Sequence, residues 1–132
     1  MKAAVIYEHG PADTVQVADD LPVPEPGRGE VRVRVRAAAL NYLDIFVRNG
    51  WPGLQLAYPH ILGADAAGTV DAVGEGVSDW VPGDRVGLDP TLEWGDSLRT
   101  PGQKQARFQL LGEHAPGVQA EYIVIPARNL IK

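Results

Sequence analysis

Three neighbouring stretches decide the fold: Gly63-Ala64-Asp65-Ala66-Ala67-Gly68-Thr69-Val70, Val73-Gly74-Glu75-Gly76-Val77 and Pro82-Gly83-Asp84-Arg85-Val86. Residues 61–73 predict a strand that is interrupted at Gly63. Gly74-Glu75-Gly76 is typical of a tight turn, and Pro82-Gly83 predicts a second turn that leads into another strand. Short strands joined by glycine turns are therefore the expected structure of this region.

The segment upstream, residues 30–39, has the clearest strand pattern in the chain. Apolar residues occupy every second position: Val31, Val33, Val35 and Ala37. Arginines take the alternate positions: Arg32, Arg34 and Arg36. Because side chains at i and i+2 lie on one face of a strand, we expect a buried apolar face and a solvated arginine face.

Between these two strand regions, residues 41–49 change to a helical period. Three apolar residues stand at i, i+3 and i+4: Leu43, Phe46 and Val47. This spacing predicts a short helix. Asn41 or Asp44 is suited to cap its start, and Gly50 is placed to end it.

The rest of the chain adds further short strands, expected at 2–7, 15–18, 118–126 and from 130 onward. Residues 21–29 form a stiff Pro-rich connector, and residues 89–117 are expected to form an irregular polar lobe. Frequent turns and one or two short helices in a mainly β chain predict a small β-barrel or sandwich.

Composition narrows the possible classes of protein. The chain has 132 residues, which suits one domain, and a net charge of −5, which argues against nucleic acid or an anionic membrane as partner. No apolar run approaches the roughly 20 residues needed to cross a membrane, and the N-terminus lacks a signal peptide's apolar stretch. A cytoplasmic location is the default expectation. The chain has no cysteine, which excludes disulfides and thiolate ligands.

Three stretches together resemble the N-terminal half of the medium-chain dehydrogenase/reductase superfamily. They are residues 39–50, with Asn41-Tyr42-Leu43-Asp44, the region 63–86 quoted above, and residues 111–126, from Leu111-Gly112-Glu113-His114 through Ala120-Glu121-Tyr122. The resemblance implies that residues 1–132 form a GroES-like, partly open β-barrel that binds substrate. It also implies a C-terminal Rossmann domain, absent from this chain, that binds NAD or NADP, with the active site in the cleft between the two domains.

The departures from the zinc alcohol dehydrogenases of this superfamily concern the metal ligands. Those enzymes place a cysteine where this chain has Asn41, and a His-Glu pair where it has Ala64-Asp65. A catalytic zinc needs three strong ligands, and an amide and a methyl group do not supply them. The lobe, which carries four cysteines around a structural zinc in many relatives, has none here. We therefore expect no zinc at either site.

Hydride chemistry without a metal sets a different requirement. Reducing a carbonyl, or an alkene conjugated to one, places negative charge on an oxygen, which hydrogen-bond donors must stabilise. Zinc-free, quinone-oxidoreductase-like relatives use this Asn-x-x-Asp region to contact nicotinamide and substrate. We therefore assign Asn41 and Tyr42 catalytic and cofactor-binding roles, with Asp44 orienting its neighbours. The alternatives are that Asn41 is a plain helix cap, Tyr42 a packing residue and Asp44 a structural acceptor.

Four further residues are candidates for substrate binding: Trp51, Leu54, Tyr58 and Asp65. An apolar wall after the motif helix suits an aromatic or unsaturated substrate. The alternative interpretation is that Trp51, which lies in a Pro-Gly loop, only covers the end of the barrel.

Other motifs do not indicate a site. Gly74-Glu75-Gly76 lacks the third glycine and the following helix of a dinucleotide fingerprint. The three histidines, His9, His60 and His114, show no zinc-ligand spacing.

The favoured function is therefore the substrate-side half of a zinc-independent NAD(P)H-dependent oxidoreductase that acts on a small molecule. We expect it to be a homodimer or homotetramer at full length and inactive as the isolated chain. A stand-alone co-chaperonin-like protein is the alternative, and a zinc-dependent alcohol dehydrogenase domain is the third possibility.

Overall fold

A computed structural model describes residues 1–93 and 108–132 and shows a mainly β chain. Its strands are β1 (Ala3–Ile6), β2 (Gln16–Ala18), β3 (Glu30–Ala38), β4 (His60–Ile61), β5 (Ala66–Val73), β6 (Arg85–Leu88), β7 (Thr91–Leu92), β8 (Gln109–Leu110), β9 (Tyr122–Pro126) and β10 (Leu130–Ile131). The helix α1 spans Tyr42–Asn49, and two 3₁₀ turns lie at Ala12–Thr14 and Ala127–Asn129. The predictions of a mainly β fold and of a helix after the arginine-rich strand are confirmed.

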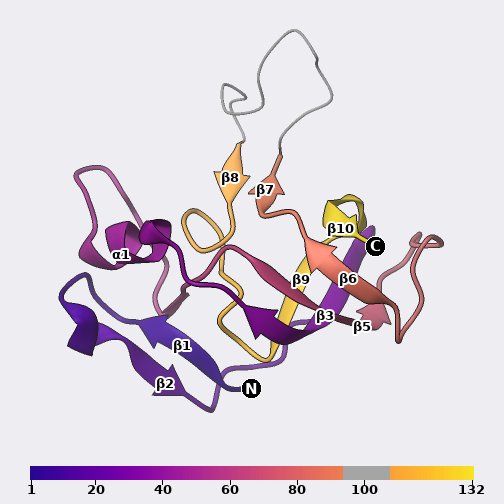
Figure 1. Ribbon diagram of the computed structural model, residues 1–132, viewed down its shortest axis with the longest axis horizontal. Helices are drawn as coiled ribbons and strands as arrows, with labels where there is room; N and C mark the ends of the chain where they lie inside the picture. The colour runs from indigo at the N-terminus through magenta and orange to yellow at the C-terminus, as the bar shows by residue number, and fades with distance from the viewer. Residues whose placement is uncertain (94–107) are drawn as a thin grey trace, which may run out of the picture.

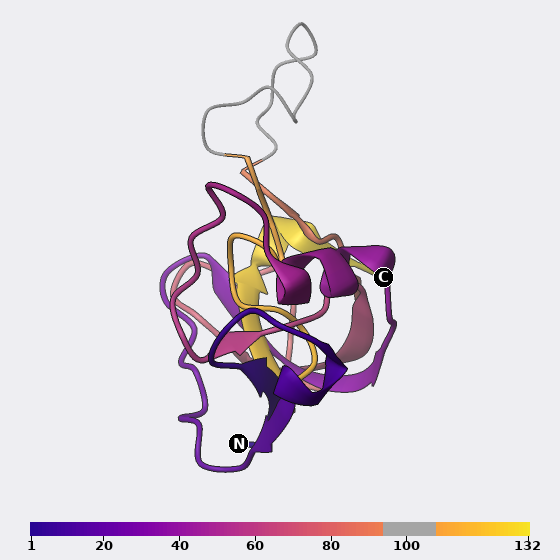
Figure 2. The same cartoon turned by 90° about the vertical axis from the view of Figure 1, so that its left-hand side faces the viewer.

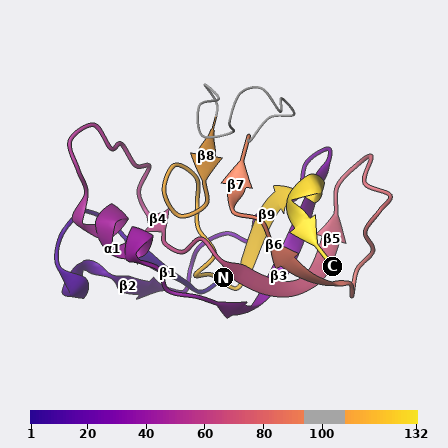
Figure 3. The same ribbon diagram turned by 45° about the horizontal axis from the view of Figure 1, so that its top comes forward.

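The main sheet has five antiparallel strands in the order β10-β6-β5-β3-β9. The long strands β3 and β5 sweep around the shorter ones, so the sheet curls into a partly open barrel (Figure 3). A second sheet, β2-β1-β4, lies beside α1 at the other end of the molecule, as Figure 1 shows. The expectation of a partly open β-barrel is confirmed.

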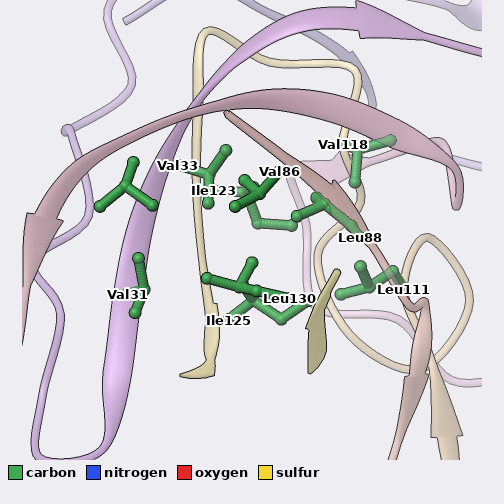
Figure 4. Close-up of a cluster of buried hydrophobic side chains, with 10 residues drawn as sticks. Val31, Val33, Val86, Leu88, Leu111, Val118, Ile123, Ile125 and Leu130 are labelled. Atoms are coloured by element: carbon green, nitrogen blue, oxygen red, sulfur yellow. The ribbon is translucent and has the colours of Figure 1, made fainter. Parts of the chain in front are cut away.

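The apolar face of β3 forms one wall of the main core. Val31 and Val33 are fully buried there, as the alternation predicted. The cluster gathers side chains from β3, β5, β6, β9, β10 and the segment 111–118 (Figure 4): Val31, Val33, Val70, Val86, Leu88, Leu111, Val118, Ile123, Ile125 and Leu130. Ala37 does not continue the pattern and is exposed, and the pairing of β3 with β5 is irregular between Val35 and Ala37.

The opposite face of β3 is solvated at Arg34 and Arg36 but not at Arg32. Arg32 Nε donates to Asp71 Oδ2 at 2.7 Å, and Arg32 Nη1 donates to Glu25 Oε1 at 2.9 Å. These bonds raise the pKa of the Arg32 guanidinium, and the hydrogen bond to Asp71 has the largest effect. Arg32 therefore fixes the Pro-rich connector against the sheet.

Close approach of two strands leaves no room for a side chain at one position of β5. A Cβ atom at Gly68 would lie 2.1 Å from the backbone oxygen of Arg34. By contrast, a Cβ at Gly87 in β6 would meet no atom within 4 Å. Gly68 is therefore a packing requirement of the curled sheet.

The helix α1 packs on a separate apolar cluster. Val47 of the helix packs with Ile6 and Leu62, all of them buried, and Leu43 and Leu54 pack against this group. Figure 2 views the molecule from this side, with α1 above the N-terminal strands. The helix is thus fixed against β1 of the second sheet and against the residue that follows β4.

The base of the lobe is an ordered ribbon. β7 and β8 pair antiparallel and project from the barrel (Figure 1), and Leu111, which follows them, is buried in the main core. His60 is also buried here, and its Nε2 lies 3.0 Å from the carbonyl oxygen of Gly112. Burial lowers the pKa of His60. The centre of the predicted lobe, residues 94–107, lies outside the described residues.

None of the helices in the described ranges 1–93 and 108–132 is long and apolar enough to cross a membrane.

Candidate active site

The start of α1 is built by two polar residues. Asn41 has extended backbone angles (φ −127°, ψ 158°) and precedes the helix, and it forms a capping box with Asp44. In this arrangement Asp44 Oδ2 accepts from the backbone N–H of Asn41 at 2.9 Å. Gly50, with φ 74°, ends the helix in a conformation that favours glycine. Both predicted ends of the helix are therefore confirmed.

Asp44 also holds the loop that follows β4. Its second oxygen, Oδ1, accepts from the backbone N–H of Gly63 at 3.1 Å, and the side chain is buried, with 6% of the residue exposed. Both carboxylate oxygens thus bind backbone N–H groups from different segments. This couples the helix start to the Gly63-Ala64-Asp65 turn.

A third contact joins the same two segments. Asn41 Nδ2 donates to Asp65 Oδ2 at 2.8 Å. An ionised carboxylate is only an acceptor, so the amide NH₂ of Asn41 must face Asp65 and its Oδ1 must face elsewhere. The candidate residues Asn41, Asp44 and Asp65 are therefore linked by hydrogen bonds, while the side chain of Ala64, next to Asp65, has no polar atom.

Beside this network lies a cavity of about 550 Å³. It is lined by Val15, Leu40, Asn41, Tyr42, Asp44, Ile45, Arg48, Leu62 and Gln119. Three of these residues were candidates from the sequence. Val15, Leu62 and Gln119 come from three distant segments, so only their tertiary placement shows that they share the site. Leu40, Ile45 and Arg48 lie next to the motif or in the predicted helix, and their position beside Asn41 and Tyr42 is the signal that could have found them.

Tyr42 lies on the outer surface of α1. It is 78% exposed, and its ring stacks on that of Phe46, with centroids 6.4 Å apart and planes inclined by 26°. Leu40 and Ile45, next to the same cavity, are also exposed. An accessible phenol on an apolar rim can donate a hydrogen bond to a molecule bound there.

The residues after the helix lie apart from this cavity. Trp51 and Tyr58 are exposed, and the ring of Tyr58 meets that of His9 edge-on with centroids 6.2 Å apart. Leu54 packs on the apolar cluster under α1. None of the three lines the cavity that Asn41 and Tyr42 border.

The histidines make separate contacts. His9 Nδ1 lies 2.9 Å from the backbone oxygen of Val47, and His114 Nδ1 accepts from the backbone N–H of Leu110 at 3.3 Å. Within the part of the chain that the structure describes, no three His, Cys, Asp or Glu side chains form a group that could hold a metal ion.

Comparison with known proteins identifies the family. The family model described as "Alcohol dehydrogenase GroES-like domain" matches residues 27–132. An L-threonine 3-dehydrogenase of Anaeromyxobacter sp. (strain Fw109-5) is 36% identical over 126 residues, covering 92% of this chain and 37% of that protein. A quinone oxidoreductase of Rattus norvegicus is 33% identical over 95 residues, covering 72% of this chain and 29% of that protein.

A solved structure agrees with these matches. The crystal structure of an NAD-dependent alcohol dehydrogenase superposes with a TM-score of 0.90 at 49% identity, covering 99% of this chain and 39% of that one. The chain thus spans about a third of the length of the relatives it matches. The curled β-sheet, the capped helix and these matches lead to one conclusion: the chain belongs to the alcohol dehydrogenase GroES-like domain family.

Proposed function

We propose that this chain is the substrate-side domain of a zinc-independent, NAD- or NADP-dependent oxidoreductase that reduces a carbonyl, quinone or enone, or oxidises an alcohol. The observation that carries the proposal is the hydrogen bond between Asn41 and Asp65 beside the cavity. The relatives, which include an NAD-dependent alcohol dehydrogenase and a quinone oxidoreductase, support the reaction class.

The residues at this point do not fit a catalytic zinc. Such a metal needs three strong ligands of the cysteine, histidine or carboxylate kind. Here one position is an amide, the next is the methyl group of Ala64, and the remaining carboxylate, Asp65, already binds Asn41 at 2.8 Å. The same hydrogen bond joins two segments that a metal would otherwise bridge.

The proposed chemistry uses neutral donors. A bound nicotinamide cofactor supplies or accepts the hydride, and the chain's own residues orient the reactants and stabilise charge on the substrate oxygen. Tyr42 donates its phenol hydrogen to that oxygen, because it is exposed at the rim of the cavity. Asn41, with its amide oriented by Asp65, positions the cofactor or substrate through the second N–H of that amide.

Asp44 has a positioning role in this proposal. Both its oxygens accept backbone hydrogen bonds, and the side chain is buried. It therefore holds Asn41 and the turn at Gly63 rather than contacting a substrate.

The remaining length of the relatives suggests where the cofactor is held. Each of them is about three times as long as the matched region. We propose that a Rossmann domain C-terminal to residue 132 binds most of the nucleotide and completes the cleft, so the 132-residue chain alone lacks turnover.

The test uses the protein joined to its cofactor-binding domain. We expect Tyr42→Phe and Asn41→Ala each to lower kcat by about 100-fold, the usual loss when one donor to a developing oxyanion is removed. Tyr7→Phe is a matched control, because Tyr7 is also an exposed tyrosine but does not border the cavity. Metal analysis should find less than stoichiometric zinc. Unchanged kcat and KM in both variants, or a tightly held zinc whose loss abolishes turnover, would refute the proposal.

A further inference from the structure

Gln119 carries a buried polar atom with no partner. Its side-chain Nε2 is closed to solvent and makes no hydrogen bond to any described residue. Buried amide groups are almost always hydrogen-bonded, because an unmet donor loses its water without compensation. A group of this kind in a natural protein therefore needs an explanation.

The backbone and stem of Gln119 are tightly held. Its N–H donates to the carbonyl oxygen of Leu62 at 2.9 Å, and its carbonyl accepts from the N–H of Ala4 at 2.8 Å. Its Cγ lies so close to Gly63 that a Cβ there would be only 2.7 Å away. The residue is thus fixed on two other segments, while its Nε2 has no hydrogen-bond partner among the described residues.

The amide belongs to the wall of the candidate site. Gln119 lines the same cavity as Asn41 and Tyr42, although it lies far from them in the sequence. Other polar side chains of this cavity are engaged: Asp44 by two backbone N–H groups, and Arg48 Nε by the carbonyl oxygen of Gly10. No hydrogen bond to a described residue holds Nε2 of Gln119, and rotation about the Cγ–Cδ bond changes the direction of its N–H groups without moving the backbone.

We propose that Gln119 is a specificity-determining residue that donates a hydrogen bond to a second oxygen of the substrate, the first being the reacting oxygen near Tyr42. This rests on the proposed function and narrows its substrate class to compounds with two acceptor oxygens, such as diketones, quinones and hydroxyketones. The apolar lining of the cavity, Val15, Ile45 and Leu62, suits the carbon skeleton between the two oxygens.

The test compares two probes that differ only in the second oxygen, cyclohexane-1,4-dione and cyclohexanone. In the protein with its cofactor domain, Gln119→Leu should lower kcat/KM for the dione by 10-fold or more while changing that for cyclohexanone less than 2-fold. Gln119→Glu has similar size but no N–H when ionised, so it should show the same selective loss. Gln16→Leu, an exposed position on β2, is the matched control.

Binding to the 132-residue chain provides a readout that does not depend on turnover. Titration with the dione should shift the side-chain NH₂ resonances of ¹⁵N-labelled Gln119, and cyclohexanone should shift them less. Equal shifts for both probes, no shift for either, or an equal loss of kcat/KM for both in Gln119→Leu would overturn the inference. Selective dione binding without turnover by the longer protein would refute the proposed function and leave the role of Gln119 standing.

Discussion

Replacing Asp44 by alanine is expected to destabilise the domain severely. The carboxylate is buried, at 6% exposure, and accepts from the N–H of Asn41 at 2.9 Å and from that of Gly63 at 3.1 Å. A hydrogen bond to a charged group contributes about 1.5–3 kcal/mol, so two of them together give roughly 3–6 kcal/mol. A domain of this size has a free energy of unfolding of about 5–15 kcal/mol, so Asp44→Ala removes a large part of it.

Urea unfolding followed by circular dichroism measures this loss. Asp44→Asn keeps one acceptor oxygen and should lose about half as much, which separates the lost bonds from the lost volume. Asp13→Ala is the control, because Asp13 is an exposed carboxylate in the first turn of a 3₁₀ helix and should change the free energy of unfolding by less than about 0.5 kcal/mol. A loss below about 1 kcal/mol for Asp44→Ala, with an unchanged urea slope, would show that the two backbone contacts do not carry the stability we assign to them.

Two further predictions concern other parts of the fold. Since burial lowers the pKa of His60 below the 6.5 of the unfolded chain, the unfolded state binds its proton first as the pH falls. The free energy of unfolding should therefore decrease below about pH 6.5, by at most about 1.4 kcal/mol per pH unit, until the folded pKa is reached. Urea midpoints measured between pH 7 and pH 5 should show this decrease in the wild-type protein and in the control variant His114→Gln, which replaces an exposed histidine. The decrease should be smaller in His60→Gln. An identical pH profile in all three proteins would contradict the assigned role of His60. Gly68→Ala should destabilise by about 3 kcal/mol or more, because its Cβ would lie 2.1 Å from a backbone oxygen, whereas Gly87→Ala, with open space around it, should stay within about 1 kcal/mol of wild type. Equal thermal midpoints for the two alanine variants would refute the steric argument.

Local sequence patterns were sufficient for most of the secondary structure. The alternation of valines placed β3, and the cap residues at Asn41 and Gly50 placed both ends of α1. These features depend on neighbours within a few residues, so they can be predicted without knowing the tertiary fold. The irregularity between Val35 and Ala37 could not be predicted in this way, because it is a feature of the pairing with β5.

The site was predictable only in part, for the same reason. Asn41, Tyr42 and Asp44 lie in one motif, and the structure brings them to one cavity. No sequence pattern around Gln119 marks it as a site residue. Its backbone is held by Ala4 and Leu62, which are far away in the sequence, and only the tertiary structure shows that its Nε2 has no hydrogen-bond partner among the described residues. Leu54 is a candidate for the substrate pocket because it follows the helix, and the structure shows it partly buried against the cluster beneath α1, a contact that its position in the sequence does not specify.

The pairing of the first strand has a consequence for synthesis of the protein. β1 lies between β2 and β4, and Lys2 also donates its backbone N–H to the carboxylate of Glu121, 119 residues further along the chain. At a translation rate of about 5–20 residues per second, roughly 6–24 s pass between the appearance of the two residues. During that interval β1 can already pair with β2 and β4, but its hydrogen bonds with residues 119–121 cannot form. The link between the second sheet and the segment before β9 is therefore completed only after nearly the whole of this domain has been synthesised.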